Sequence, residues 1–359
     1  MQACIITFQS AYNYGAVLQA FALQEYLNGN FAETRILDYH NNEIDASYRS
    51  PGLIDFVYKP KNAIFKSIQS FLYKGKKKKI NQFRNQYFRL TKRYDAVNIK
   101  DASNEADVFI TGSDQVWNYL IVDRDGTYYL DFVKNRRTCS YAASFGVASI
   151  PQEYREFYRK NLNNIDSISV REGSGAEIVK NVTGREAKMM PDPTLLVNQE
   201  TWNRLCATPN DTGKYILVYK ITKADKLLSF SKKLSKKTGL PIVYIPNDLK
   251  SGSIGKLKTN VGPEEWLGYI KNAEYVVTNS FHGTVFSILF NKKFFSEVSS
   301  KVNPSTSRLK SLLEMFGLEE RTLECYTDKM LDKELDKAEI NKVLEAQRER
   351  AYDFFKQVF

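Results

Sequence analysis

One histidine in this chain lies where an imidazole could act as a general acid or base. It is His282, one of only two histidines, and it lies in the segment YVVTNSFHGTVFSILF at residues 275–290. The first four residues of this segment predict a short buried strand, and the apolar run from Val285 predicts a buried helix. The histidine would then lie in the turn between them, at the carboxyl edge of a sheet, where α/β folds bind ligands. Helix capping by the imidazole is the alternative interpretation.

The turn around this histidine also contains groups that could bind an anion. Ser280 precedes the histidine, and Gly283 and Thr284 follow it. The first amides of a helix lack partners within the helix, and the helix dipole makes this end positive. We therefore expect the amides of Gly283 and Thr284 to form a cradle for a phosphate or a carboxylate.

A second unit of strand, loop and helix is predicted at the N-terminus. Residues 3–8 are rich in β-branched side chains, and a helix begins near Gly15 and continues to about residue 27. Asn13 and Gly15 would therefore lie at a second edge that faces a ligand. The spaced glycines of the dinucleotide-binding fingerprint are missing, so the unit does not match that motif.

An acidic residue follows the predicted strand at residues 106–110. Ser113 and Asp114 lie in a glycine turn that also contains an amide and an indole, a combination suited to binding a sugar. The alternative is a turn in which Asp114 accepts a hydrogen bond from its own backbone.

Two further predicted strands end in polar side chains. Ser144 follows the strand at residues 138–142, and Arg171 follows the strand at residues 167–170. Arg171 also lies next to a predicted helix N-terminus, which is an unfavourable place for a cation unless an anion binds there.

The elements that position these residues alternate between strand and helix twice along the chain. This pattern predicts an α/β protein with two Rossmann-like parallel-sheet domains that face each other across a cleft. The predicted boundaries are an N-terminal domain at 1–197 with a basic helical insertion at about 41–100, a linker at 198–213, a C-terminal domain at 214–330, and a tail helix at 331–359 that could pack back on the first domain.

The charge of the 359-residue chain favours anionic partners. It has 52 Lys and Arg against 41 Asp and Glu, a formal net charge of +11. Much of the excess lies in the run from Lys74 to Lys79. A solvated helix face is one interpretation of this run, and contact with an anionic membrane surface is the other. Nucleic acid fits less well because no known binding module surrounds the run.

Other features of the sequence indicate a cytoplasmic protein. The four cysteines are far apart, so they predict reduced thiols rather than disulfides or a metal site. No acid or histidine cluster predicts a bound metal. We find neither a secretory signal nor an apolar run long enough to span a membrane.

Six motifs occur in an order that resembles the polysaccharide pyruvyl transferase family, and together they span most of the chain. They are NYGAVLQAFALQEYL from Asn13, FITGSDQVWN from Phe109, YAASFG from Tyr141, SVREGSG from Ser169, PDPTLL from Pro191 and TNSFHGTVFSILF from Thr278.

The resemblance implies a GT-B-like fold and a specific reaction. Family members move the enolpyruvyl carbons of phosphoenolpyruvate onto two hydroxyls of a sugar, giving a cyclic pyruvate ketal and phosphate. Phosphoenolpyruvate is then a donor substrate, and no bound cofactor is implied. The acceptor would be a saccharide of a bacterial capsule or exopolysaccharide, lipid-linked at the inner face of the membrane.

The resemblance also assigns roles to residues of this chain. His282 is the expected acid, Arg171 the main cation for the donor, and Asp114 the base or orienting group for the acceptor. Many members have an arginine where this chain has Ser280. Arg308 or Lys220 would then have to supply the missing charge.

Two other functions are compatible with the same sequence. A nucleotide-sugar glycosyltransferase would use the same kind of cleft, but it needs a base pocket for which we find no distinctive residues. A family member that binds glycans without catalysis would fit the loss of an arginine at Ser280.

Overall fold

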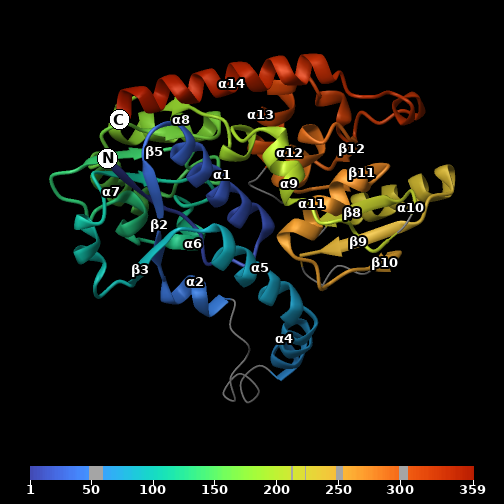
Figure 1. The fold of residues 1–359 in the computed structure, drawn as a ribbon, viewed down its shortest axis with the longest axis horizontal. Helices are drawn as coiled ribbons and strands as arrows, with labels where there is room; N and C mark the ends of the chain where they lie inside the picture. The colour runs from blue at the N-terminus through green and yellow to red at the C-terminus, as the bar shows by residue number, and fades with distance from the viewer. Residues whose placement is uncertain (48–59, 212, 223, 248–253, 299–305) are drawn as a thin grey trace.

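The computed structural model describes residues 1–47, 60–211, 213–222, 224–247, 254–298 and 306–359 (Figure 1). Its first sheet is parallel throughout and has the strand order β3-β2-β1-β4-β5. We call the half of the chain that contains this sheet the first domain. Its strands are β1 (Gln2–Ile6), β2 (Glu33–Tyr39), β3 (Leu90–Tyr94), β4 (Val108–Thr111) and β5 (Arg137–Ser140).

The helices of the first domain connect these strands and cover the sheet. They are α1 (Tyr14–Asn30), α2 (Asn42–Ser47), α4 (Pro60–Leu72), α5 (Lys74–Tyr87), α6 (Tyr119–Val122), α7 (Arg155–Leu162) and α8 (Gly173–Thr183). A short parallel pair, β6 (Ser169–Val170) and β7 (Lys188–Met189), flanks α8. The 3-10 helices are η1 (Ile99–Asn104), η2 (Gly126–Tyr129), η3 (Gln152–Tyr154) and η4 (Pro193–Leu195).

The second sheet is also parallel throughout, with the order β10-β9-β8-β11-β12, and it defines the second domain. Its strands are β8 (Ile216–Lys220), β9 (Ile242–Pro246), β10 (Lys256–Leu257), β11 (Tyr275–Thr278) and β12 (Lys293–Ser296). Its helices are α9 (Gln199–Leu205), α10 (Asp225–Thr238), α11 (Pro263–Asn272), α12 (Phe281–Leu289) and α13 (Thr306–Phe316), followed by η5 (Glu319–Arg321), η6 (Asp328–Leu331) and α14 (Lys337–Val358). The predicted fold class is thus confirmed.

The unit around the histidine forms as its sequence predicts. YVVT becomes β11, in which all four residues are buried, and the apolar run becomes α12, which is buried along its whole length. The Ser280 side chain caps α12 by accepting a hydrogen bond from the amide of Gly283. Strand, cap and helix therefore hold His282 in the first turn of α12.

The region predicted as a helical insertion contains a strand that its sequence pattern does not predict. β3 pairs with β2 at the edge of the first sheet and buries Thr91 and Tyr94, whereas Lys92 and Arg93 face solvent. The two charged residues hide the strand pattern in the sequence. Residues 48–59 of the predicted insertion lie outside the described residues.

The segment predicted as a linker contains helix α9, which is part of the core. The ring of Trp202 is fully buried and packs edge-on against Phe21 of α1 and Phe286 of α12. One apolar cluster therefore extends from the first domain through Trp202 into the second domain. Edge-to-face aromatic pairs of this kind add about 0.5–1.5 kcal/mol each beyond their buried area.

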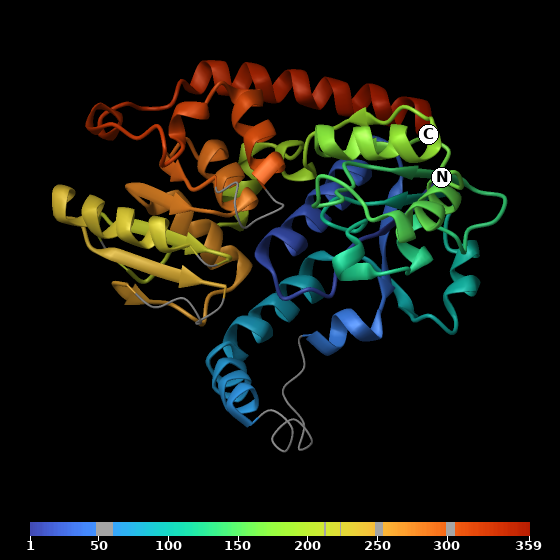
Figure 2. The same ribbon diagram turned by 180° about the vertical axis from the view of Figure 1, so that it is seen from behind.

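Two further helices, α14 and α5, connect the domains through side-chain contacts. Helix α14 runs back along the first domain (Figure 2), where Phe355 stacks on Tyr141 of the loop after β5. Helix α5 reaches the second domain, where Lys79 pairs with Glu265 at 2.7 Å and Lys76 donates to Asn247 at 3.3 Å. The basic run is therefore not a uniformly solvated helix face.

Candidate active site

A cavity of about 430 Å³ lies where the carboxyl ends of strands from both sheets meet. The first domain contributes the loops after β1, β4 and β5 together with α2 and α6, and the second domain contributes the loop after β8, the start of α12 and the first turn of α13. The residues that line it are Phe8, Ala11, Asn13, Ala16, Ile44, Asp114, Gln115, Asn118, Leu120, Ile121, Gly146, Ile221, Thr222, Ser280, Phe281, His282 and Arg308. Of the predicted site residues, Asn13, Asp114, Ser280, His282 and Arg308 therefore share one cavity.

His282 lies at the boundary between the two domains. Its Nε2 is 3.5 Å from Oδ2 of Asp192, and this nitrogen has no hydrogen-bond partner within the described part of the chain. On the opposite side, a Cβ added to Gly15 would lie only 2.1 Å from Nδ1 of the imidazole. Gly15 is thus needed because the histidine approaches the backbone of α1 too closely for any larger residue.

Asp192 is the centre of the hydrogen bonds behind this histidine, and no pattern in the sequence indicates this role. Its Oδ2 accepts from Nη1 of Arg171 at 2.6 Å and from Oγ of Ser113 at 3.1 Å, and its Oδ1 accepts from the amide and hydroxyl of Thr194. Burial alone would raise the pKa of Asp192, but His282 and Arg171 outweigh it and hold that pKa well below its usual range. The motif PDPTLL from Pro191 contains this residue, but the motif by itself indicates no role for it.

Arg171 is buried behind the cavity wall. Its guanidinium lies over the ring of Phe281 at 4.6 Å, and its Nη2 is 3.8 Å from Oδ1 of Asp114, too far for a hydrogen bond. Burial works against its charge, but Asp192 and Asp114 raise the pKa of Arg171 above its ordinary value. Nε and Nη2 have no hydrogen-bond partner among the described residues, so this cation retains unused donors.

Arg308 supplies a second buried cation, which lines the cavity directly. It is 5% exposed, and its Nε finds no acceptor in the described structure. Burial, followed by repulsion from Arg171, lowers the pKa of Arg308 to about 10. The other candidate for the missing charge, Lys220, is buried at the end of β8 and does not line the cavity.

Asp114 and Asn13 line the cavity from the first domain. Asp114 has a positive φ of 79°, and its Oδ1 accepts from the amide of Gln115 at 2.9 Å. The local turn that was the alternative for Asp114 is therefore present, yet the residue still faces the cavity. Asn13 caps α1 by accepting from the amide of Ala16.

Two predicted binding residues have structural partners instead of facing the cavity. Ser113 donates to Asp192, and Ser144 donates to Oε1 of Glu172 at 2.8 Å. Both hydroxyls are fully buried, and neither residue lines the cavity. Neither hydroxyl is therefore placed to contact a ligand in this cavity, because each one points towards a buried carboxylate rather than out of the edge of the sheet.

The two amides that we expected to form an anion cradle both have acceptors within the protein. The amide of Gly283 donates to the Ser280 hydroxyl at 3.1 Å, and the amide of Thr284 donates to the Ser280 carbonyl at 3.0 Å. Neither Gly283 nor Thr284 lines the cavity. The amides that remain at this helix end, with no acceptor among the described residues, are those of Phe281 and His282.

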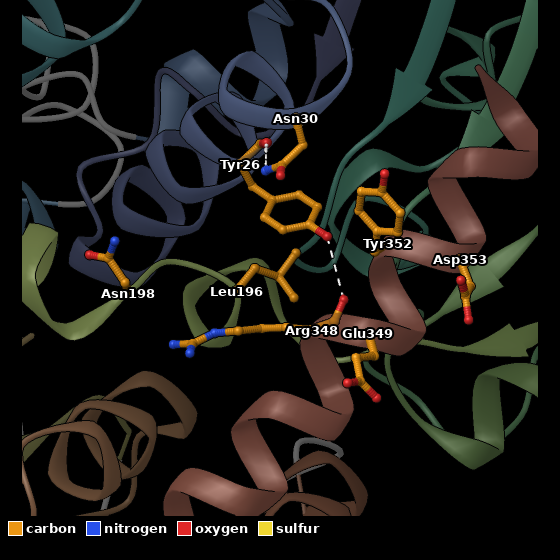
Figure 3. Close-up of a pocket in the computed structure, with 8 residues that line it drawn as sticks. All are labelled: Tyr26, Asn30, Leu196, Asn198, Arg348, Glu349, Tyr352 and Asp353. Atoms are coloured by element: carbon orange, nitrogen blue, oxygen red, sulfur yellow. Dashed lines mark hydrogen bonds between the residues drawn. The ribbon is translucent and has the colours of Figure 1, made fainter.

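A second hollow, of about 540 Å³, lies between α1 and α14 (Figure 3). Tyr26 and Tyr352 project into it, and the hydroxyl of Tyr26 donates to the carbonyl of Arg348 at 3.4 Å. It contains none of the predicted site residues.

Comparison with known families identifies the chain. A sequence model of the polysaccharide pyruvyl transferase family matches residues 13–298, which include every residue that lines the cavity except Phe8, Ala11 and Arg308. The chain belongs to the polysaccharide pyruvyl transferase family. This membership makes it a transferase of polysaccharide biosynthesis, and the resemblance inferred from the six motifs is confirmed.

Solved structures with a similar fold have low sequence identity to this member of the pyruvyl transferase family. The UDP-GlcNAc 2-epimerase from Methanocaldococcus jannaschii, in complex with UDP-GlcNAc and UDP, is 11% identical, with a TM-score of 0.46 over 98% of this chain and 100% of that chain. Glycosyltransferase SsfS6 from Streptomyces sp. SF2575, complexed with thymidine diphosphate, is 12% identical, with a TM-score of 0.42 over 99% of each chain. No curated protein sequence matches this chain.

Proposed function

We propose that this protein transfers the enolpyruvyl group of phosphoenolpyruvate to two hydroxyls of a saccharide. The observation that carries the proposal is the meeting of Arg308, His282 and the first amides of α12 around one cavity. Phosphoenolpyruvate has a phosphate and a carboxylate, and buried cations with unused donors bind such groups strongly. Arg308 is our candidate for the direct contact with the donor, and Arg171 supports it from behind Phe281.

In the proposed reaction, His282 donates a proton to the methylene carbon of phosphoenolpyruvate. The neighbouring carbon becomes oxocarbenium-like and is attacked by the first sugar hydroxyl, whose proton passes to a base. The bond from that carbon to the phosphate oxygen then breaks, phosphate leaves, and the carbon becomes oxocarbenium-like again. The second hydroxyl attacks this carbon and closes the cyclic ketal, and its proton returns to the imidazole of His282. Asp192 lies 3.5 Å from Nε2 of the imidazole, and in the proposed complex it closes to hydrogen-bonding distance and orients the ring.

We assign the acceptor to the side of the cavity formed by the first domain. Asp114 offers a carboxylate that can orient or deprotonate a hydroxyl, and Asn13 lines the same side of the cavity. The acceptor we propose is a saccharide of a cell-surface polysaccharide, carried on a lipid. The exposed lysines Lys74 and Lys78 would contact the anionic inner face of the membrane.

None of the described helices combines the length and the apolar character that a bilayer-spanning segment needs.

The test is to incubate the protein with phosphoenolpyruvate and saccharide acceptors and to measure phosphate release and ketal formation. Acceptor-dependent phosphate release would support the proposal. Release of a nucleoside diphosphate from nucleotide sugars, with no reaction of phosphoenolpyruvate, would indicate a glycosyltransferase instead. Binding of glycans with neither reaction would indicate a member without catalysis.

A further inference from the structure

Helix α4 exposes a stripe of large apolar side chains. Ile64 is 53% exposed, Ile68 is 54% exposed and Phe71 is 78% exposed. Their spacing of four and three residues places them on one face of the helix. Figures 1 and 2 show that α4 projects away from both sheets, on the side of the molecule opposite α14. A continuous exposed apolar stripe on a projecting element indicates an interaction site rather than ordinary surface.

The apolar stripe is bordered by serine side chains on one edge and by the lysines of α5. Ser67, Ser70, Phe71, Lys74 and Lys77 line an open hollow of about 470 Å³ at the junction of α4 and α5. The sequence of these two helices has two lysines in α4 and six Lys or Arg in α5, and it has no acidic residue. The charge is thus complementary to an anionic surface.

We propose that α4 and the first turn of α5 form an element that docks on an anionic phospholipid surface. Ile64, Ile68 and Phe71 enter the boundary between headgroups and acyl chains, as the apolar face of an interfacial helix does. Lys74 and Lys78 lie at the level of the headgroups and contact lipid phosphates. This docking rests on the proposed membrane contact of the basic run. It adds an apolar insertion, which anchors the protein in the bilayer surface.

The composition of this surface favours lipid over a protein partner. Lysine is depleted in protein interfaces, whereas a narrow apolar stripe bordered by lysines is typical of helices that lie in a membrane interface. A second copy of the chain would bring two strongly basic surfaces together, which repel each other.

Contacts of α5 hold this element in a fixed orientation relative to the cavity. Lys79 donates to both carboxylate oxygens of Glu265 at 2.7 Å, and the hydroxyl of Tyr73 donates to the carbonyl of Pro246 at 3.1 Å. Both acceptors belong to the second domain. Docking through α4 therefore also sets how the cavity faces the membrane that carries a lipid-linked acceptor.

The experiment measures vesicle binding without donor or acceptor, so its result is separate from that of the proposed reaction. The full chain is mixed with vesicles of phosphatidylglycerol and phosphatidylcholine, or of phosphatidylcholine alone, and sedimented. We expect binding to the anionic vesicles, and at least a tenfold loss of affinity in the variant Ile64→Ser, Ile68→Ser, Phe71→Ser. The variant Lys74→Ser, Lys78→Ser should bind the anionic vesicles more weakly, and its remaining affinity should depend less on salt concentration.

Two control variants test specificity. Val97→Ser removes an apolar side chain that is 91% exposed elsewhere, and Lys232→Ser with Lys233→Ser removes exposed charge from α10. Both should bind like the wild type.

A direct readout of insertion comes from Phe71→Trp. The three native tryptophans, Trp117, Trp202 and Trp266, are fully buried, so a blue shift of the fluorescence on adding anionic vesicles would report residue 71. Absence of this shift, or wild-type binding by the triple serine variant, would overturn the proposal. A dimer in solution that the triple variant abolishes would also overturn it, in favour of a protein interface. Pyruvyl transfer to a soluble acceptor should be unchanged in the triple variant.

Discussion

The imidazole of His282 occupies the space that a side chain on Gly15 would need. These residues come from different domains, and a Cβ at Gly15 would lie 2.1 Å from Nδ1 and 2.6 Å from Cγ of the histidine. The position of the proposed acid therefore depends on how the two domains fit together, as well as on its own helix.

Gly15→Ala should displace the histidine and lower kcat by about 100-fold, because misplacement of a catalytic group by about 1 Å has an effect of that size. The measurement is phosphate release from phosphoenolpyruvate with a saccharide acceptor. The matched control is Gly29→Ala on the same helix, where an added Cβ meets no atom within 4 Å. Equal activity of both variants would show that the close approach has no role in catalysis.

His282→Gln should lower kcat by at least about 100-fold, the lower end for loss of general acid catalysis. The glutamine keeps a polar group beside Asp192, so the midpoint of urea unfolding should change little. Near wild-type turnover in this variant would remove His282 from the mechanism.

Removing one partner of the buried pair of Arg171 and Asp192 should destabilise the protein. The side chain of Arg171 is only 2% exposed, and Asp192→Asn removes the negative charge closest to its guanidinium. The expected loss in the free energy of unfolding is about 3–5 kcal/mol, measured by urea denaturation. Arg171→Met combined with Asp192→Asn should recover much of this stability but no activity. A double variant as unstable as the sum of the single ones would contradict the pairing.

Arg308→Met should separate binding from stability. Because Arg308 is buried beside another cation, its removal should leave the free energy of unfolding unchanged or higher, while the KM for phosphoenolpyruvate rises at least tenfold. Arg321 is the matched control, since it is also buried but donates to the carbonyl of Lys333 at 2.6 Å. Arg321→Met should lower stability without a specific effect on KM. An unchanged KM in Arg308→Met would place the donor elsewhere.

Lys76 should make stability depend on pH. Burial lowers the pKa of Lys76 to about 8, whereas in the unfolded chain it has the ordinary value of about 10.5. Between these values the unfolded state binds more protons than the native state, so the native state gains stability as pH rises.

At neutral pH the buried charge should cost about 3 kcal/mol relative to a neutral group. Lys76→Met should therefore be more stable than the wild type at pH 7, and the difference should shrink towards pH 10. The exposed Lys78→Met provides the comparison, and its difference from the wild type should not vary with pH. A constant difference for Lys76→Met would mean that the lysine stays charged in the native state.

The sequence predicted the parts of this site that depend on local pattern. Strand β11 and helix α12 followed from YVVT and the apolar run after it, so His282 could be placed in their turn. Asp192 could not be found in this way, because its role comes from Arg171 and His282, which are distant in sequence. The side-chain directions of Ser113 and Ser144 were missed for a similar reason. A strand end predicts where a residue lies, but its hydroxyl turns towards whichever buried carboxylate needs a donor.

The apolar cluster that continues through Trp202 has a consequence for how the molecule loses its structure. Because the ring of Trp202 packs on Phe21 and on Phe286, neither sheet can melt without exposing part of the interior of the other. Heating should therefore produce a single calorimetric transition, in contrast to the two separate transitions of a pair of loosely tethered lobes.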